Sequence, residues 1–185
     1  MAAKVITIHV RGVRPLLANN PAQMRRGEVQ RGKKIPEPEE EAQSGLYLAD
    51  GGHTGICTEA FRNCVVSAGK AFRKGRQSMF GLLSHLMNVD EVTALTTPEG
   101  KPATWQIDSR RAVVQRQGII RSRPRYDEWE ARPRLLFDDE MCDAGLIVKC
   151  AEHGGRHNGV GNYRGEKGGP MGRFVVVGHE VEDAS

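Results

Sequence analysis

The stretch KVITIHVR at residues 4–11 decides the fold class, because apolar and polar residues alternate along it. Alternation places two sets of side chains on opposite faces of an extended chain: Lys4, Ile6, Ile8 and Val10 on one, and Val5, Thr7, His9 and Arg11 on the other. This period of two predicts a half-buried strand over residues 4–10. The rest of the chain must supply partner strands for it and a cover for its apolar face.

Working outward, the patterns predict the order strand, helix, strand, strand, helix, strand. The five further elements are helices at 58–73 and 139–153 and strands at 110–123, 128–137 and 173–178. The two middle strands, joined by a turn at Pro124 and Tyr126–Asp127, should pair as an antiparallel hairpin. In the second of them, Trp129, Ala131, Leu135 and Phe137 share one face.

The ends of the two helices carry recognisable signals. Thr58 is the expected cap of the first helix, and Asp138 or Asp139 caps the second. Gly154 and Gly155 are expected to end the second helix.

The predicted fold class is therefore α+β: a modified ferredoxin-like, RRM-like βαββαβ antiparallel sheet with both helices on one face. The 185 residues suit one domain. Three segments lie outside this series of elements: a polar arm at about 20–44, a side insertion at about 77–108 and an acidic tail at 179–185. Within the insertion, the patterns predict a short helix at 79–87 and a side hairpin with strands at 91–96 and 103–107. The arm joins a basic block to an acidic one, so it is expected to be a mobile loop or a projection that orders against a neighbouring subunit or a ligand.

Composition favours a polyanionic partner. Arginines make up 19 of the 27 basic residues, and arginine presents a planar fork of donors that fits phosphate. Nucleic acid is the natural partner class, although a GC-rich genome would also shift lysine to arginine. No apolar run approaches the ~20 residues of a membrane span. A cytoplasmic protein that does not enter membranes is expected.

Candidate catalytic and metal-binding groups are sparse. None of the four cysteines forms a Cys-x-x-Cys pair, so free thiols in a reducing compartment are expected. Cys150, His153 and His157 are close in sequence, yet no second ligand pair accompanies them. The histidines are scattered, and no nucleotide-binding or hydrolase motif occurs. We expect no cofactor, no metal and no catalysis.

Candidate nucleic-acid contacts fall in four groups. A glycine-rich loop, with eight glycines between residues 154 and 172, carries Arg156, Tyr163, Arg164, Lys167 and Arg173. The predicted strand region carries Arg116, Arg121, Arg123 and Arg125, the end of the first helix carries Lys70, Arg73, Lys74 and Arg76, and the arm carries Arg25, Arg26, Lys33 and Lys34. Glycines would let backbone N–H groups approach phosphate, and Tyr163 could stack on a base.

Each group also has a plain structural alternative. The loop could simply join helix to strand, and the strand arginines could pair with Glu128 and Glu130 across the sheet. The cations after the first helix could complement its C-terminus.

Several motifs carry a resemblance to known proteins. Segments 15–19, 45–47, 121–124, 159–164 and 172–174 resemble small uncharacterised proteins of bacteriophages and prophages, which often have Pro where this chain has Gly165. More distantly, the chain resembles the RAMP superfamily, the ferredoxin-like backbone subunits of CRISPR effector complexes. That likeness rests on the strand running into Pro15-Leu16-Leu17, on the loop at 55–62 and on the glycine-rich loop. In the 55–62 loop, Cys57 and Thr58 replace the usual Pro and Gly.

The resemblance implies a non-enzymatic protein that binds RNA or single-stranded DNA, forms a homo-oligomer along its ligand or joins effector-complex subunits, and works in the cytoplasm of a bacterial host. Two alternatives stay open: a phage recombination or replication accessory that anneals strands, and a phage protein that binds a host or virion protein.

Overall fold

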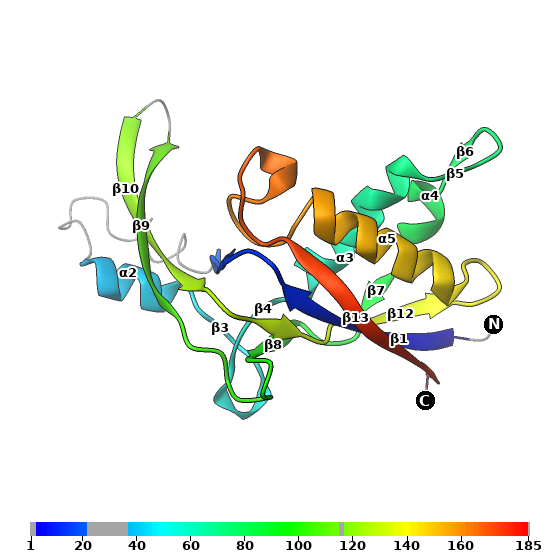
Figure 1. The fold of residues 1–185 in the computed structure, drawn as a ribbon, viewed down its shortest axis with the longest axis horizontal. Helices are drawn as coiled ribbons and strands as arrows, with labels where there is room; N and C mark the ends of the chain where they lie inside the picture. Colours follow the sequence, from blue (N-terminus) through cyan, green and yellow to red (C-terminus); the bar gives the residue numbers. More distant parts are fainter. Residues whose placement is uncertain (1–2, 22–36, 115–116, 185) are drawn as a thin grey trace.

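A long central strand organises the molecule (Figure 1). The computed structural model describes residues 3–21, 37–114 and 117–184. Strand β1 (Ala3–Gly12) pairs with β13 (Phe174–Asp183) along one edge and with β11 (Glu130–Ala131) and β12 (Arg134–Asp138) along the other. All these pairings are antiparallel. The fold is thus α+β with an antiparallel sheet, and Ile6, Ile8 and Val10 are buried as the alternation predicted.

The sheet continues beyond β11 and β12. Strand β7 (Met87–Asn88) pairs with β12, and β8 (Val92–Thr96) pairs with β11. Strands β4 (Thr54–Cys57) and β3 (Tyr47–Leu48) extend it from β8. The insertion predicted at 77–108 contains a short helix as expected, α4 (Phe80–Leu83), and the chain turns back after β8, where the Ala103 amide donates to the Leu95 carbonyl oxygen at 3.0 Å. The insertion is not a separate side hairpin, however, because β7 and β8 pair with β12 and β11 in the main sheet and Leu95 is fully buried.

The arginine-rich segment predicted as a core strand at 110–123 lies outside this sheet. Strands β9 (Gln106–Val114) and β10 (Gln117–Tyr126) form their own hairpin, and β2 (Leu16–Leu17) joins β10. The hairpin projects from the body of the molecule (Figure 1). Pro124, predicted to mark a turn, lies within β10 opposite Ile107.

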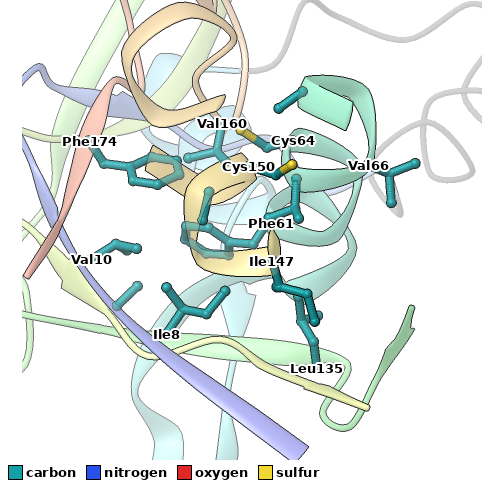
Figure 2. Close-up of a cluster of buried hydrophobic side chains, with 14 of the residues drawn as sticks. Ile8, Val10, Phe61, Cys64, Val66, Leu135, Ile147, Cys150, Val160 and Phe174 are labelled. Atoms are coloured by element: carbon teal, nitrogen blue, oxygen red, sulfur yellow. The ribbon is translucent and has the colours of Figure 1, made fainter. Parts of the chain in front are cut away.

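Both long helices cover the same face of the main sheet, as predicted. Helices α3 (Thr58–Ala68) and α5 (Ala144–His157) enclose the core between themselves and β1, β12 and β13 (Figures 1 and 2). Phe61, Trp129 and Phe174 form an aromatic cluster there, with ring centroids 5.9–6.4 Å apart. All three side chains are buried, and they join α3, the segment before β11 and the start of β13.

The helix ends differ from the predicted caps. Thr58 is the first residue of α3, not its cap, and its hydroxyl hydrogen-bonds with that of Thr93 at 2.8 Å. Helix α5 is capped by Asp143, whose carboxylate accepts from the Leu146 amide at 2.9 Å, and not by Asp138 or Asp139. Only the cap geometry distinguishes these three nearby aspartates.

Gly154 and Gly155 lie inside α5 and do not end it. A Cβ at Gly154 would sit 2.8 Å from Cys64 Sγ, and one at Gly155 would sit 2.4 Å from the Phe174 carbonyl oxygen. The two glycines therefore let α5 approach α3 and β13 closely. Their role is packing, which outweighs their low helix propensity.

The remaining short elements connect these parts: α2 (Pro38–Ser44), η1 (Asp50–Gly52), η2 (Gly69–Ala71), β5 (Arg73–Lys74), β6 (Gln77–Ser78), α4 (Phe80–Leu83) and η3 (Gly165–Lys167). Helix α2 belongs to the predicted arm and packs on β10. The predicted acidic tail is strand up to Asp183, because β1 offers pairing partners as far as Lys4. No helix in the described part of the chain is long and apolar enough to cross a membrane.

The close packing of α5 gives a stability prediction. Replacing Gly155 with Ala forces a Cβ against a backbone carbonyl, so the free energy of unfolding should fall by about 1–3 kcal/mol. Gly81→Ala is the matched control, because a Cβ at Gly81 meets nothing within 4 Å. That variant should be neutral or gain up to about 1 kcal/mol. Chemical denaturation of both variants tests this, and equal stability of the two would contradict the packing role.

Candidate nucleic-acid interface

One face of the β9–β10 hairpin gathers four arginines. The register pairs Arg110 with Arg121, Asp108 with Arg123, and Gln106 with Arg125. Side chains of directly opposite residues, and of every second residue along a strand, point to the same side of a sheet. We call the resulting surface the arginine face; it consists of Arg110, Arg121, Arg123 and Arg125.

Three of these guanidinium groups have carboxylate partners. Asp108 lies between Arg110 and Arg125, with its Oδ2 2.9 Å from Arg110 Nη2 and 3.6 Å from Arg125 Nη1. The hydrogen bond from Arg110 lowers the pKa of the buried Asp108 carboxyl, and the charge of Arg125 adds to this effect. Arg121 pairs with the buried carboxylate of Glu41 on α2 at 2.9 Å.

Arg123 is the exception. This guanidinium is half-buried and makes no hydrogen bond or ion pair with the residues that the structure describes. Burial lowers its pKa and the positive charge of Arg121 lowers it further, while the more distant charges of Glu41 and Asp108 oppose this shift without reversing it. A half-buried cation with no direct carboxylate contact is stabilised when an anion approaches it. The arginine face thus carries a positive charge that favours the approach of an anion.

The glycine-rich loop lies against this face. Arg110 sits over the ring of Tyr163, 5.6 Å from its centroid. Tyr163 is 53% exposed and adopts a positive φ of 56°, which turns its ring outward from the loop. The sequence analysis predicted two separate patches, the glycine-rich loop and the strand arginines. In the structure, the two lie side by side. Sequence reasoning missed Arg110, because it stands next to Arg111 on β9 and only the strand register places it opposite Arg121.

The loop's own backbone is largely occupied. The amides of Asn162, Met171 and Gly172 donate to the carbonyls of Leu17, Tyr163 and Pro15 at 2.8–3.0 Å. A Cβ at Gly172 would sit 1.8 Å from the Val160 carbonyl oxygen, so this glycine serves the tight fold of the loop. These amides therefore cannot also cradle a phosphate.

The loop cations differ in their freedom. Arg164 is held by the Glu166 carboxylate at 3.0–3.1 Å and by the Gly161 carbonyl oxygen at 3.2 Å. Glu166 also accepts from the Ser67 hydroxyl at 2.7 Å, which ties the loop to α3. Lys167 and Arg173 are exposed. Arg164 thus mainly stabilises the conformation of the loop, while Lys167 and Arg173 are free to contact a ligand.

The remaining predicted residues fall elsewhere. Lys70, Arg73, Arg76 and Arg156 are exposed on the helical side of the molecule, after α3 and on α5. The side chain of Lys74 and the whole of Arg25, Arg26, Lys33, Lys34 and Arg116 lie outside the described residues.

The open face of the main sheet offers a contrasting surface. It holds a cavity of about 470 Å³ lined by His9, Arg11 and Glu130 among others. Glu130 accepts from Arg11 Nε at 2.6 Å and meets His9 Nε2 at 2.7 Å, so it does not pair with the hairpin arginines. Burial alone would raise the pKa of Glu130, but these two hydrogen bonds lower it.

Further along the open face, Arg134 pairs with Asp90 at 3.6 Å and with Glu182 at 3.2 Å. Charges on this face are therefore largely matched by neighbours, unlike the charge on Arg123.

Comparison with models of known protein families finds none that matches this chain, and comparison with curated proteins finds no similar sequence. Among the described residues, no group of three or more His, Cys, Asp or Glu side chains is placed to hold a metal ion. Geometry and charge therefore carry the interpretation of this surface.

The substitution Asp108→Asn tests how much the buried Asp108 carboxylate contributes to stability, in comparison with the exposed carboxylate of Asp127. The loss of the charge-assisted hydrogen bonds of Asp108 should lower stability by about 1–3 kcal/mol near neutral pH. Because the folded-state pKa of Asp108 is depressed, this contribution is present above the unfolded value of about 3.9 and is lost as the pH falls through the folded pKa. The deficit of the variant should therefore shrink in acid.

The matched control is Asp127→Asn, which removes an exposed partner of Arg125 and should cost no more than about 1 kcal/mol. Denaturation at several pH values measures both variants. A pH-independent deficit for Asp108→Asn would show that the carboxylate is not ionised in this role.

Proposed function

We propose that this protein binds RNA or single-stranded DNA, without catalysis, through the arginine face and Tyr163. The observation that carries the proposal is Arg123, a half-buried cation with no carboxylate partner among the described residues. A phosphate at this position would offset the burial of the guanidinium and the repulsion from Arg121. Arginine forks bind phosphate through two parallel hydrogen bonds, which suits a chain of regularly spaced phosphates.

Tyr163 favours a single strand over a duplex. Its ring is exposed beside the arginine face, where a base lifted out of a helix could stack on it. Bases in a duplex already stack on one another and present only their edges. An aromatic ring next to a row of cations is the usual composition of a single-strand site.

The strand order supports a ferredoxin-like core. Strands β13, β1, β11/β12 and β7/β8 lie in this order and pair antiparallel, with α3 and α5 on one face. In this interpretation β7/β8 take the place that the sequence assigned to residues 110–123. The β9–β10 hairpin then becomes the projecting arm of a RAMP-like subunit, and copies of the protein line up along one ligand.

The decisive variant is Arg123→Ala. Binding to a labelled single strand should weaken, and the slope of log affinity against log salt should fall by about 0.7, because the variant neutralises one phosphate fewer. Arg132→Ala is the matched control, because Arg132 is an exposed arginine lining the cavity of the open sheet face. Equal losses in the two variants would mean that only net charge matters and would contradict the proposed interface.

Two further arms sharpen the test. Tyr163→Ala should cost about 1–3 kcal/mol of binding and leave the salt slope unchanged, since stacking involves no counterion release. Repeating the titration with longer strands should raise the number of copies bound to each strand. Thermal denaturation of each variant identifies losses that come from unfolding.

A further inference from the structure

A second set of cations and rings lies on the helical side of the molecule. We call it the α5 surface; it consists of Lys70, Phe72, Lys149, His153, Arg156 and His157. None of its lysines and arginines forms an ion pair with a described residue. Unlike the open sheet face, this surface therefore keeps its positive charge uncompensated.

Ring contacts make this surface continuous. Lys149 Nζ lies 5.2 Å from the ring centroid of Phe72, and Phe72 meets His153 edge-on with centroids 5.3 Å apart. His153 and His157, one turn apart on α5, have centroids separated by 4.5 Å. A row of flat rings flanked by cations is thus built from α5 and the segment after α3.

The glycine-rich loop links this row to the arginine face. Its short helix η3 packs on the end of α5: the Glu166 amide donates to the Asn158 carbonyl oxygen at 2.9 Å, and Gly165 lies against the His157 carbonyl. The same loop carries Tyr163, which contacts Arg110. In Figure 1 the loop lies between the projecting hairpin and α5. Lys167, exposed on η3, supplies a cation between the two surfaces.

We propose that a single strand held by the arginine face continues over Tyr163 onto the α5 surface and passes the row formed by Phe72, His153 and His157, where His153 takes up a proton as the strand binds. This inference rests on the proposed function and extends it in two ways. It gives the ligand a path across the molecule, and it makes the affinity depend on pH in the range where histidine side chains titrate.

The direction of the pH dependence follows from the charges around the two rings. Burial lowers the pKa of His153, and the neighbouring His157 and Arg156 lower it further, which favours the neutral imidazole in the free protein. A phosphate nearby favours the imidazolium form. Binding therefore takes up protons, and affinity rises as the pH falls.

The other charged groups on the elements around the pair are mostly positive: Lys149, Glu152 and Arg156 on α5, Lys70 and Arg73 after α3, and Arg164, Glu166 and Lys167 around η3. Glu166 is already held by Arg164 and Ser67. Glu152 is thus the one carboxylate in this set that has no such partner among the described residues.

The test compares a short strand of about four nucleotides with one of about sixteen, which bracket the sites of single-strand binding folds. Wild-type protein should bind the long strand at least about tenfold more tightly at pH 5.5 than at pH 7.5, as expected for one proton taken up over part of that range. His153→Gln/His157→Gln should lose most of this difference. Affinity for the short strand should change little in the same variant.

A charge variant tests the path without the histidines. Lys149→Ala/Arg156→Ala should weaken long-strand binding at both pH values and lower its salt slope by about 1.4, because two phosphates are no longer neutralised. His153 packs on Phe72, so thermal denaturation must show that the double glutamine variant is folded. If it is not, the charge variant carries the test.

The outcomes separate the two proposals. Retained pH dependence in the folded glutamine variant, or an unchanged salt slope in the charge variant, would overturn the path over α5. Two short strands bound to one protein copy would also overturn it, because the surfaces would then be independent sites. Failure of wild-type protein to bind either strand would instead reject the proposed function.

Discussion

Double-sided pairing of β1 is the constraint on which the rest of the structure depends. Strand β13 occupies one edge of β1, and β11 and β12 occupy the other. Because β8 and β7 in turn occupy the outer edges of β11 and β12, the arginine-rich segment that follows β8 in the chain has no free edge beside these strands. The helices must then cover the single face on which Ile6, Ile8 and Val10 project. Close approach of α5 to β13, which Gly155 permits, closes that face.

Displacement of the hairpin from the main sheet explains where charge remains uncompensated. On the sheet, opposite charges sit on neighbouring strands and neutralise one another, as Arg11 and Glu130 do. The hairpin carries arginines on both strands, and its buried carboxylate Asp108 already pairs with Arg110 and Arg125. Glu41 on the neighbouring α2 pairs with Arg121. Arg123 is the residue of the arginine face that has no ion pair with a described residue. The binding surface is thus a consequence of topology as much as of composition.

Sequence patterns predicted the elements that bury an apolar face and failed for those that do not. The alternation in β1 and the spacing of apolar residues in α3 and β11/β12 were sufficient to predict these elements. Both helices also lie on one face of the sheet, as expected. The sequence pattern predicts a single long strand at 110–123 because residues 114–117 contain no glycine, proline, asparagine or aspartate to signal a reversal. The pair Gly154–Gly155 suggested a helix end because glycine is a poor helix former. Its actual role in packing was not predictable from the local sequence, because the contacting residues Cys64 and Phe174 are distant in the chain.

The most direct test of the account is to find which residues touch a bound strand. A single strand carrying photoreactive bromouracil, irradiated with the wild-type protein and digested, should yield crosslinked peptides that contain Tyr163 and the β9–β10 hairpin. Stacked aromatic rings are the favoured partners of such bases in single-strand sites. Crosslinks confined to the open sheet face around His9 and Arg11 would contradict the account, because they would place the ligand on the surface whose charges are already paired.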